Sequence, residues 1–216
     1  MHIIKRIGAW LAVLISVLGI ASLVFAWQYA QTRPVYHASL IHQYADTYRL
    51  DPNLVIAVIK TESDFHTDAV SPMDARGLMQ ILPDTAEWIA RELDEEDSYQ
   101  IEDLFEPDTN IRYGTFYLRY LLDHFRNTDL AIAAYNGGMG NVTQWIDEDT
   151  ITKEGENMHS IPIDETRDYV QKVNTNREMY ERLYGNQLPE EDGKKPTFHA
   201  VAENYKFLFD WFFTAR

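Results

Sequence analysis

An apolar stretch without a charged residue runs from Ile7 to Trp27, near the start of the chain. At about 1.5 Å rise per residue, a helix of this length reaches roughly 31 Å, which matches a bilayer core of about 30 Å. Lys5 and Arg6 precede the stretch and Arg33 is the first charge after it, so the N-terminus is expected inside and the rest of the chain outside. The pattern predicts a single N-terminal transmembrane helix within residues 1–33.

A cleavable signal peptide is the alternative for this segment. Val24-Phe25-Ala26 offers a small-residue cleavage pattern. The apolar stretch is longer than a typical signal core of about 7–15 residues, so we favour the anchor. Both interpretations place the following residues outside the cytoplasmic membrane, either on a single-pass membrane protein or on a protein secreted after signal cleavage.

Apolar positions at helical spacing continue from His37 to Gly185, where no convincing alternation of strand positions occurs. We therefore predict one mainly α domain over residues 37–185. A polar linker and an aromatic C-terminal helix are expected over residues 186–216. Capping residues and prolines place the expected helix starts at Asp51-Pro52, Pro83, Asp108, Asp129 and Asp164.

The charge and the residue types exclude several classes of function. The formal net charge is −15, which repels nucleic-acid phosphates, so no nucleic-acid partner is expected. A chain without cysteine has no disulfides, no catalytic thiol, no cysteine metal site and no lipid-modified cysteine. The 7 histidines are scattered and form no HExxH motif, so neither a metal nor another cofactor is expected.

A carboxyl group occupies a position that the helical pattern assigns to the interior. Val55, Val58 and Ile59 form an apolar stripe, which Glu62 continues at i+3 and i+4 spacing. Burial and the negative end of the helix dipole both disfavour the ionised form, so the pKa of Glu62 is expected to be raised. A carboxyl kept protonated near neutral pH suits a general acid. From spacing alone, a structural glutamate paired with a buried Arg or Lys is the alternative.

Three further segments carry polar groups that could contact a ligand. Gln80, in a turn-rich stretch, offers an amide donor and a carbonyl acceptor. Tyr135 and Asn136 would project from a helix end followed by glycines. Glu165 and Tyr169 are four positions apart and so share a helix face. Each also has an ordinary explanation, as a solvated turn, a helix stop and an exposed helix start.

Taken together, these segments resemble the catalytic domain of soluble-type lytic transglycosylases, within the lysozyme-like superfamily. The resemblance covers about residues 40–184, with four motifs in the family's order. The matching motifs are Glu62-Ser63, Gly77-Leu78-Met79-Gln80, Ala134-Tyr135-Asn136-Gly137-Gly138, and Ile161-Pro162 followed by Glu165-Thr166-Arg167 and Tyr169. The resemblance implies a lysozyme-like helical domain preceded by the transmembrane helix, held outside a bacterial cell membrane.

The resemblance also implies an activity and a set of site residues. The family cleaves the β-1,4 bond between N-acetylmuramic acid and N-acetylglucosamine in peptidoglycan and leaves 1,6-anhydromuramyl ends. By resemblance Glu62 is the catalytic acid and then the base, while the substrate's acetamido group stabilises the anomeric carbon. The residues that match the family's sugar cleft are Ser71, Gln80, Tyr135, Asn136, Glu165 and Tyr169. The expected partners are peptidoglycan glycan strands and, through the N-terminal helix, the cytoplasmic membrane, and the sequence does not reveal any protein partners.

Two departures and two alternative functions accompany the resemblance. Asp74 stands where a glycine is common, but Asp tolerates the left-handed conformation better than most residues, so the turn is expected to survive. His66-Thr67 replaces a common Asn-Pro and is expected to matter little. A lysozyme-type muramidase is the nearest alternative function, because Asp64, Asp68 and Asp74 lie nearby in the sequence and could position water or attack the sugar. A non-catalytic glycan-binding envelope component is the other, although a pure binder has no need of an acid on an apolar stripe.

The C-terminal segment, Phe198 to Phe213, lies outside the resemblance and is rich in aromatic residues. Positions on one helix face recur at Val201, Tyr205, Leu208 and Phe212. Leaving this surface in water would be unfavourable, so it must bury against something. We expect it to pack on the outer face of the domain, near residues 37–48. The membrane interface is the alternative.

Overall fold

The computed structural model describes residues 2–185 and 192–206, and these fall into two compact units. The first unit is His37–Tyr180. The second combines the start of the chain, up to Tyr36, with the part that begins at Glu181. Long helix α8 crosses from the first unit into the second, so each unit is described below by itself.

The first unit is built from helices, as the sequence predicts. Across residues 37–180, pairing between extended segments is limited to isolated bridges, such as Val70 with Arg76 and Arg76 with Ile81. The helices are α2 (Ala38–Tyr48), α3 (Pro52–Glu62), α4 (Pro83–Glu92), η1 (Ile101–Phe105), α5 (Pro107–Phe125), α6 (Thr128–Gly137), α7 (Met139–Asp147), η2 (Met158–Ser160) and α8 (Asp164–Tyr184).

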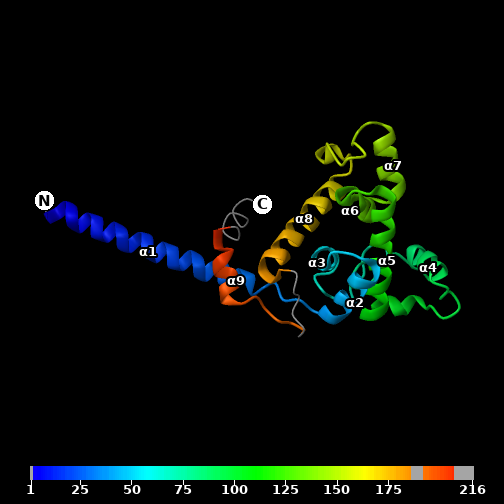
Figure 1. Cartoon of the computed structure of the whole chain (residues 1–216), viewed down its shortest axis with the longest axis horizontal. Coiled ribbons are helices and arrows are strands. Elements are labelled where there is room, and N and C mark those ends of the chain that lie inside the picture. Colours follow the sequence, from blue (N-terminus) through cyan, green and yellow to red (C-terminus); the bar gives the residue numbers. More distant parts are fainter. Residues whose placement is uncertain (1, 186–191, 207–216) are drawn as a thin grey trace. The chain divides into compact units, whose positions relative to one another are not determined.

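Helix α5 forms the centre of this unit (Figure 1) and packs against α2, α4, α6 and η1. Its apolar face is fully buried, with Ile111, Leu118 and Leu121 inaccessible to solvent. Gly114 lies on this face, and a Cβ atom there would come within 2.3 Å of the sulfur of Met79. The glycine therefore lets the loop before α4 approach the α5 backbone closely.

Helix α3 begins and ends as the sequence predicts. Asp51 is the N-cap and accepts a hydrogen bond from the backbone N–H of Asn53 at 2.9 Å, with Pro52 at the first helical position. The carboxylate of Asp51 also receives the Arg177 guanidinium of α8, with N···O at 2.7 Å. Residues 53–59 are buried all round, so α3 runs through the core and places Glu62 in its last turn.

Two expected helix starts are wrong, and one helix was not predicted. Pro107 fixes the first position of α5, so Glu106 rather than Asp108 is the N-cap. Helix α6 is capped by Asn127, whose side chain accepts from the Leu130 N–H at 3.1 Å, rather than by Asp129. Helix α7 was not predicted, because the glycines before it suggested a loop.

The second unit contains α1 (His2–Ala30) and the short helix α9 (Phe198–Glu203). By length and composition α1 is long and apolar enough to cross a membrane, and its window Val13–Ala30 has a mean hydropathy of 1.9 with 11% of the window buried. A signal sequence has the same properties. An isolated bridge joins Val35 to Lys194 and brings the two ends of this unit together.

The described part of the C-terminal segment packs on α1, a partner that the sequence analysis did not consider for it. The Phe198 ring lies 5.6 Å from the Trp27 ring, and the Gln31 amide donates to the carbonyl of Pro196 at 3.1 Å. Val201 is fully buried. The expected linker residues 186–191 and the apolar positions of 207–216, among them Leu208 and Phe212, lie outside the described residues.

Candidate active site

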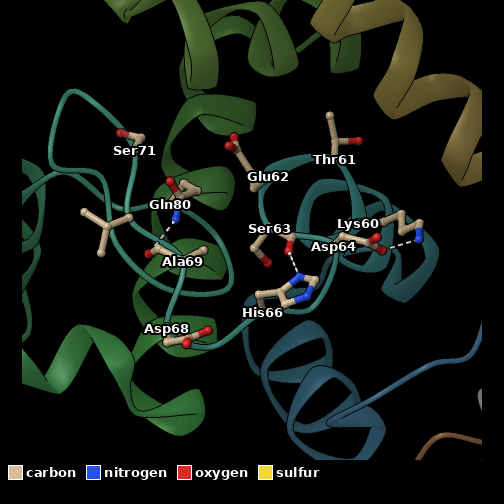
Figure 2. Close-up of a pocket in the computed structure, with 11 residues that line it drawn as sticks. Lys60, Thr61, Glu62, Ser63, Asp64, His66, Asp68, Ala69, Ser71 and Gln80 are labelled. Atoms are coloured by element: carbon tan, nitrogen blue, oxygen red, sulfur yellow. Dashed lines mark hydrogen bonds and ion pairs between the residues drawn. The ribbon is translucent and has the colours of Figure 1, made fainter.

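Glu62 lies at the C-terminal end of α3, on an open pocket of about 610 Å³. Figure 2 shows its carboxyl group close to the opening that Ser71 and Gln80 also line. This volume is within the range of small-ligand sites, about 300–1,000 Å³. The sequence analysis placed Glu62 on the stripe of Val55, Val58 and Ile59, and all three of these are fully buried.

The surroundings of Glu62 raise its pKa to about 7. Burial is the largest cause, since it disfavours the charged form. The Tyr169 hydroxyl donates a hydrogen bond to Oε1 of Glu62 at 2.6 Å and lowers the pKa in part, while the negative charge of Glu165 raises it. The raised pKa expected from the sequence is confirmed, and no buried Arg or Lys neutralises the carboxyl among the causes of the shift.

The loop from Ala69 to Ile81 forms one wall of the pocket and is held in place by hydrogen bonds to α5. Asn110 is fully buried and accepts from the Met79 N–H at 2.7 Å, while its amide donates to the carbonyls of Arg76 at 2.9 Å and Leu104 at 2.7 Å. Gly77 has φ of 73°, and a Cβ there would lie 2.1 Å from the Leu104 oxygen. Only glycine therefore fits at this point.

A second attachment joins the loop to the end of α3. Ser63, buried directly after Glu62, donates from its hydroxyl to the carbonyl of Leu78 at 2.8 Å. Gln80 takes the left-handed conformation with φ of 48°, and its side-chain amide donates to the carbonyls of Gly77 at 2.9 Å and Ala69 at 3.1 Å. Non-glycine residues at positive φ cluster at functional sites. These contacts fix the position of Gln80 relative to Glu62.

Ser71 and the turn after it also keep the expected geometry. The Ser71 hydroxyl accepts from the Ala75 N–H at 3.0 Å and from the Met73 N–H at 3.2 Å. Asp74 adopts φ of 64°, so the turn survives the replacement of the glycine that the family commonly has there. Its carboxylate pairs with the Arg76 guanidinium, with N···O at 3.0 Å.

Helices α6 and α8 supply the remaining predicted residues. Tyr135 donates to the carbonyl of Met79 at 2.9 Å, and burial together with the negative charge of Glu62 raises its pKa well above the usual value. Asn136 accepts from the buried Thr166 hydroxyl at 2.8 Å, which ties the end of α6 to α8. The structure thus brings Tyr135, Tyr169 and Glu165 into contact or electrostatic range of Glu62, and it holds Asn136 through its neighbour Thr166.

Comparison with known proteins agrees with this arrangement. Residues 39–158 match the family described as the transglycosylase SLT domain. The chain belongs to this family. The match contains Glu62, Ser71, Gln80, Tyr135 and Asn136, whereas Glu165 and Tyr169 of α8 lie beyond its end.

Individual relatives and solved structures are also similar to this chain. The soluble lytic murein transglycosylase of Salmonella typhimurium is 33% identical over 162 residues, which is 74% of this chain and 25% of the relative. The membrane-bound lytic murein transglycosylase C of Shigella sonnei is 33% identical over 167 residues, or 68% of this chain and 46% of the relative. An inactive mutant of the lytic transglycosylase Slt from Pseudomonas aeruginosa superposes with a TM-score of 0.64 at 34% identity, covering 71% of this chain and 25% of that one.

These comparisons establish the lysozyme-like helical fold of the SLT domain. The chain spans only about a quarter of the length of the Salmonella and Pseudomonas proteins. The activity of those longer proteins therefore supports a proposal for this chain and is taken up as such below.

Lys60 and His66 of the SLT domain pocket were missed as site residues, and Asp64 and Asp68 were considered only for the muramidase alternative. Lys60 and Asp64 form an ion pair on its rim, and Nδ1 of His66 donates to the Ser63 carbonyl at 2.7 Å. Asp68 also lines the pocket. No periodicity marks Asp64, His66 and Asp68, because they follow the end of α3 in irregular backbone, whereas Lys60 lies in the last turn of α3. Asn110 did carry a signal, since it is an amide on the apolar face of α5.

The SLT domain site offers acid–base chemistry on one carboxyl group. Among residues 2–185 and 192–206, no group of three or more His, Asp or Glu side chains is arranged to hold a metal ion. Glu62 instead has a donor hydroxyl on one oxygen and a pKa near neutrality. A group of this kind is protonated in about half of the molecules at pH 7, so it can give up a proton and take one back.

Proposed function

We propose that this chain is a membrane-anchored lytic transglycosylase that cleaves the glycan strands of peptidoglycan. The observation that carries the proposal is the carboxyl of Glu62, which lines an open pocket with its pKa raised to about 7. Membership of the SLT family and relatives named lytic murein transglycosylases support the substrate class. The proposed bond is the β-1,4 linkage between N-acetylmuramic acid and N-acetylglucosamine.

In the first step, protonated Glu62 donates its proton to the glycosidic oxygen as the bond from that oxygen to the anomeric carbon breaks. The acetamido group of the muramic acid residue stabilises the positive charge on that carbon. In the second step, the Glu62 carboxylate takes the proton of the C6 hydroxyl, whose oxygen bonds to the anomeric carbon and closes the 1,6-anhydro ring. Glu62 is protonated again, and no water is consumed.

The surrounding side chains have proposed roles on the substrate. The Tyr169 hydroxyl, 2.6 Å from Glu62, orients the carboxyl and stabilises its ionised form between the two steps. Ser71, Gln80, Tyr135 and Asn136 are proposed to contact the sugar rings and their acetamido groups, with Glu165 on the same face of α8 as Tyr169. The hydrogen bonds that fix Gln80 and Tyr135 to the loop support a rigid cleft.

A hydrolytic reaction would need a second carboxylate that positions water. Of the three acids that the sequence offered for this role, Asp64 and Asp74 are engaged in ion pairs with Lys60 and Arg76, while Asp68 lines the pocket. Glu165 affects the pKa of Glu62 and is the acid to test for such a role. We therefore favour the transglycosylase over the muramidase.

The proposed location is the outer face of the cytoplasmic membrane, with α1 as a single-pass anchor. Helix α1 exposes large apolar side chains along its length, including Leu14 and Ile15, which suit a lipid environment. The relative from Shigella sonnei is named membrane-bound, which supports attachment to a membrane. Cleavage after Ala26 would instead release the domain, and the mass of the protein recovered from cells separates the two outcomes.

Replacing Glu62 with Gln tests the catalytic assignment. Gln keeps the shape and can still accept from Tyr169, but it cannot titrate. We expect the release of soluble muropeptides from purified sacculi to fall about 10²–10⁴-fold or more. The matched control is Glu92→Gln at the exposed end of α4, which should keep the full rate. Near-native turnover by a folded Glu62→Gln variant would contradict the assignment.

A further inference from the structure

Helix α1 changes its surroundings abruptly near Phe25. From Leu11 to Phe25 its large apolar side chains are exposed, for example Ile15 at 69% and Phe25 at 44%. From Ala26 to Ala30 one side of the helix is covered by protein, with Ala26 at 4% and Ala30 at 0%, while Gln28 stays exposed. The cover is the C-terminal segment that contains α9 (Figure 1).

The covering segment runs antiparallel to α1. Pro196 lies at Gln31, the Phe198 ring at the Trp27 ring, and the Tyr205 hydroxyl at the Ser22 hydroxyl. Successive contacts thus step back along α1 as the C-terminal segment advances. We use the name collar for segment 194–206, which contains Phe198 and Tyr205, together with Trp27 of α1.

The polar groups of the collar are satisfied within the second unit. The Thr197 hydroxyl caps α9 by accepting from the Ala200 N–H at 3.2 Å. Asn204 donates from its side-chain amide to the carbonyl of Arg182 at 2.8 Å and to that of Ala200 at 3.0 Å. Tyr184 donates to the carbonyls of Arg33 at 2.7 Å and Lys194 at 3.0 Å. These hydrogen bonds hold the collar in a defined conformation.

The collar is nevertheless incompletely covered by protein. Phe198 remains 56% exposed although it stacks on Trp27, and Lys194 and Lys195 extend from exposed positions next to it. Aromatic rings with an apolar body and basic side chains at their edge are the residue types that favour the boundary between acyl chains and phosphate-bearing headgroups.

We propose that the collar lies in the outer lipid–water interface, where it packs on one side of α1 at the point at which α1 leaves the bilayer. The level follows from length, since Ile7 to Phe25 spans roughly 28 Å of helix, close to a bilayer core of about 30 Å. Lipid covers the exposed part of α1 and the collar covers the rest. The segment thus binds headgroups and fixes the exit end of α1, and this inference rests on the proposed membrane anchoring.

The absence of cysteine permits a direct test, because one introduced thiol gives one label site. Single variants of the full chain, Ala202→Cys on α9, Leu14→Cys on α1 and Ser98→Cys in the other unit, are labelled with an environment-sensitive fluorophore. They are placed in vesicles of phosphatidylcholine and phosphatidylglycerol at a large excess of lipid. Quenching is then compared between nitroxide lipids labelled near the headgroup, nitroxide lipids labelled deep in the acyl chain, and aqueous iodide.

If the collar lies at the interface, the label at position 202 should be quenched several-fold more by the nitroxide near the headgroup than by iodide. The label at position 14 should respond to the deep nitroxide, and the label at position 98 to iodide. Phe198→Glu should make the label at position 202 accessible to quenching by iodide, whereas the neighbouring His199→Gln should not. No effect of Phe198→Glu would overturn the role given to the ring.

Three outcomes would overturn the proposal in separable ways. If position 202 behaves as position 98 does while position 14 stays deep, α1 is anchored and the collar is not at the interface. If position 14 is reached by iodide, the membrane anchor itself fails, and the collar with it, whereas the Glu62 assignment is judged by sacculus digestion alone. If protection at position 202 disappears as lipid excess grows, a second copy of the chain covered it instead of lipid.

Discussion

At the scale of single residues, the protonation of Glu62 depends on two neighbours with opposite effects. The hydrogen bond from Tyr169 stabilises the carboxylate and lowers its pKa, whereas the negative charge of Glu165 raises it. Because the first proposed step needs the protonated acid, kcat/KM should fall as the pH rises through about 7. The position of this alkaline limb reports the pKa of Glu62 directly.

Removing Tyr169 or Glu165 should therefore shift the alkaline limb of the pH profile in opposite directions. Tyr169→Phe deletes a bond to the charged form, so the pKa rises and the limb moves to higher pH. Glu165→Gln deletes a like charge, so the limb moves to lower pH. The measurement is kcat/KM on solubilised glycan strands across the pH range for each variant.

The control is Asp168→Asn, an exposed acid on the same helix that is not among the causes of the Glu62 shift. It should leave the limb where it is. Both site variants are expected to lose rate as well, but a loss of rate alone has many causes. Shifts in the same direction for both variants would show that the electrostatic account of Glu62 is wrong.

At the scale of elements, the wall of the pocket depends on how α5 holds the loop from Ala69 to Ile81. Asn110→Ala removes the partner of three buried backbone groups, those of Met79, Arg76 and Leu104. Because buried groups left without partners are costly, we expect a loss of about 2–4 kcal/mol in the free energy of unfolding. Chemical unfolding of the full chain in detergent measures it.

Asp123→Ala on the same helix is the matched control. Asp123 pairs with Arg119 on the surface, with N···O at 2.5 Å and the Asp123 side chain 70% exposed. An exposed pair of this kind contributes little, so the change should stay within about 0.5 kcal/mol. Equal losses for the two variants would mean that Asn110 does not hold the loop.

The same elements show what could be predicted from the sequence. Helix α3 was predictable from Asp51-Pro52 and its apolar stripe, and with it the interior position of Glu62. The neighbours of Glu62 were predictable only through the resemblance, because Tyr169 lies 107 positions away in the chain and no local pattern joins them. The hydrogen bonds from Asn110 to the loop, and the pocket rim at His66 and Asp68, depend on tertiary contacts that the periodicity of the sequence does not show.

Helix boundaries show the same division between local and long-range causes. Pro107 fixes the first position of α5 through its φ, a local rule that the sequence analysis did not apply there, so its expected cap Asp108 lies two residues after the N-cap Glu106. Helix α7 follows glycines that were interpreted as a loop, and its burial of Val142 and Trp145 decides in favour of a helix. The C-terminal segment could not be placed, because its partner α1 lies at the other end of the chain.

At the scale of the whole molecule, the account involves no metal ion. The described residues contain no group of His, Asp and Glu side chains suited to one, and Glu62 supplies the proposed acid–base chemistry. We therefore expect digestion of sacculi to proceed at an unchanged rate in the presence of EDTA. A rate that falls with EDTA and returns on adding zinc would show that a metal site takes part.

The proposal as a whole rests on the reaction at the anomeric carbon, and the mass of the products tests it most directly. Purified sacculi are digested by the full chain in detergent, with the Glu62→Gln variant as the blank, and the released muropeptides are analysed by mass spectrometry. Attack by the C6 hydroxyl predicts products with 1,6-anhydromuramyl ends, each one water lighter than the hydrolytic product. Products with reducing muramic acid ends would contradict the transglycosylase and identify a muramidase.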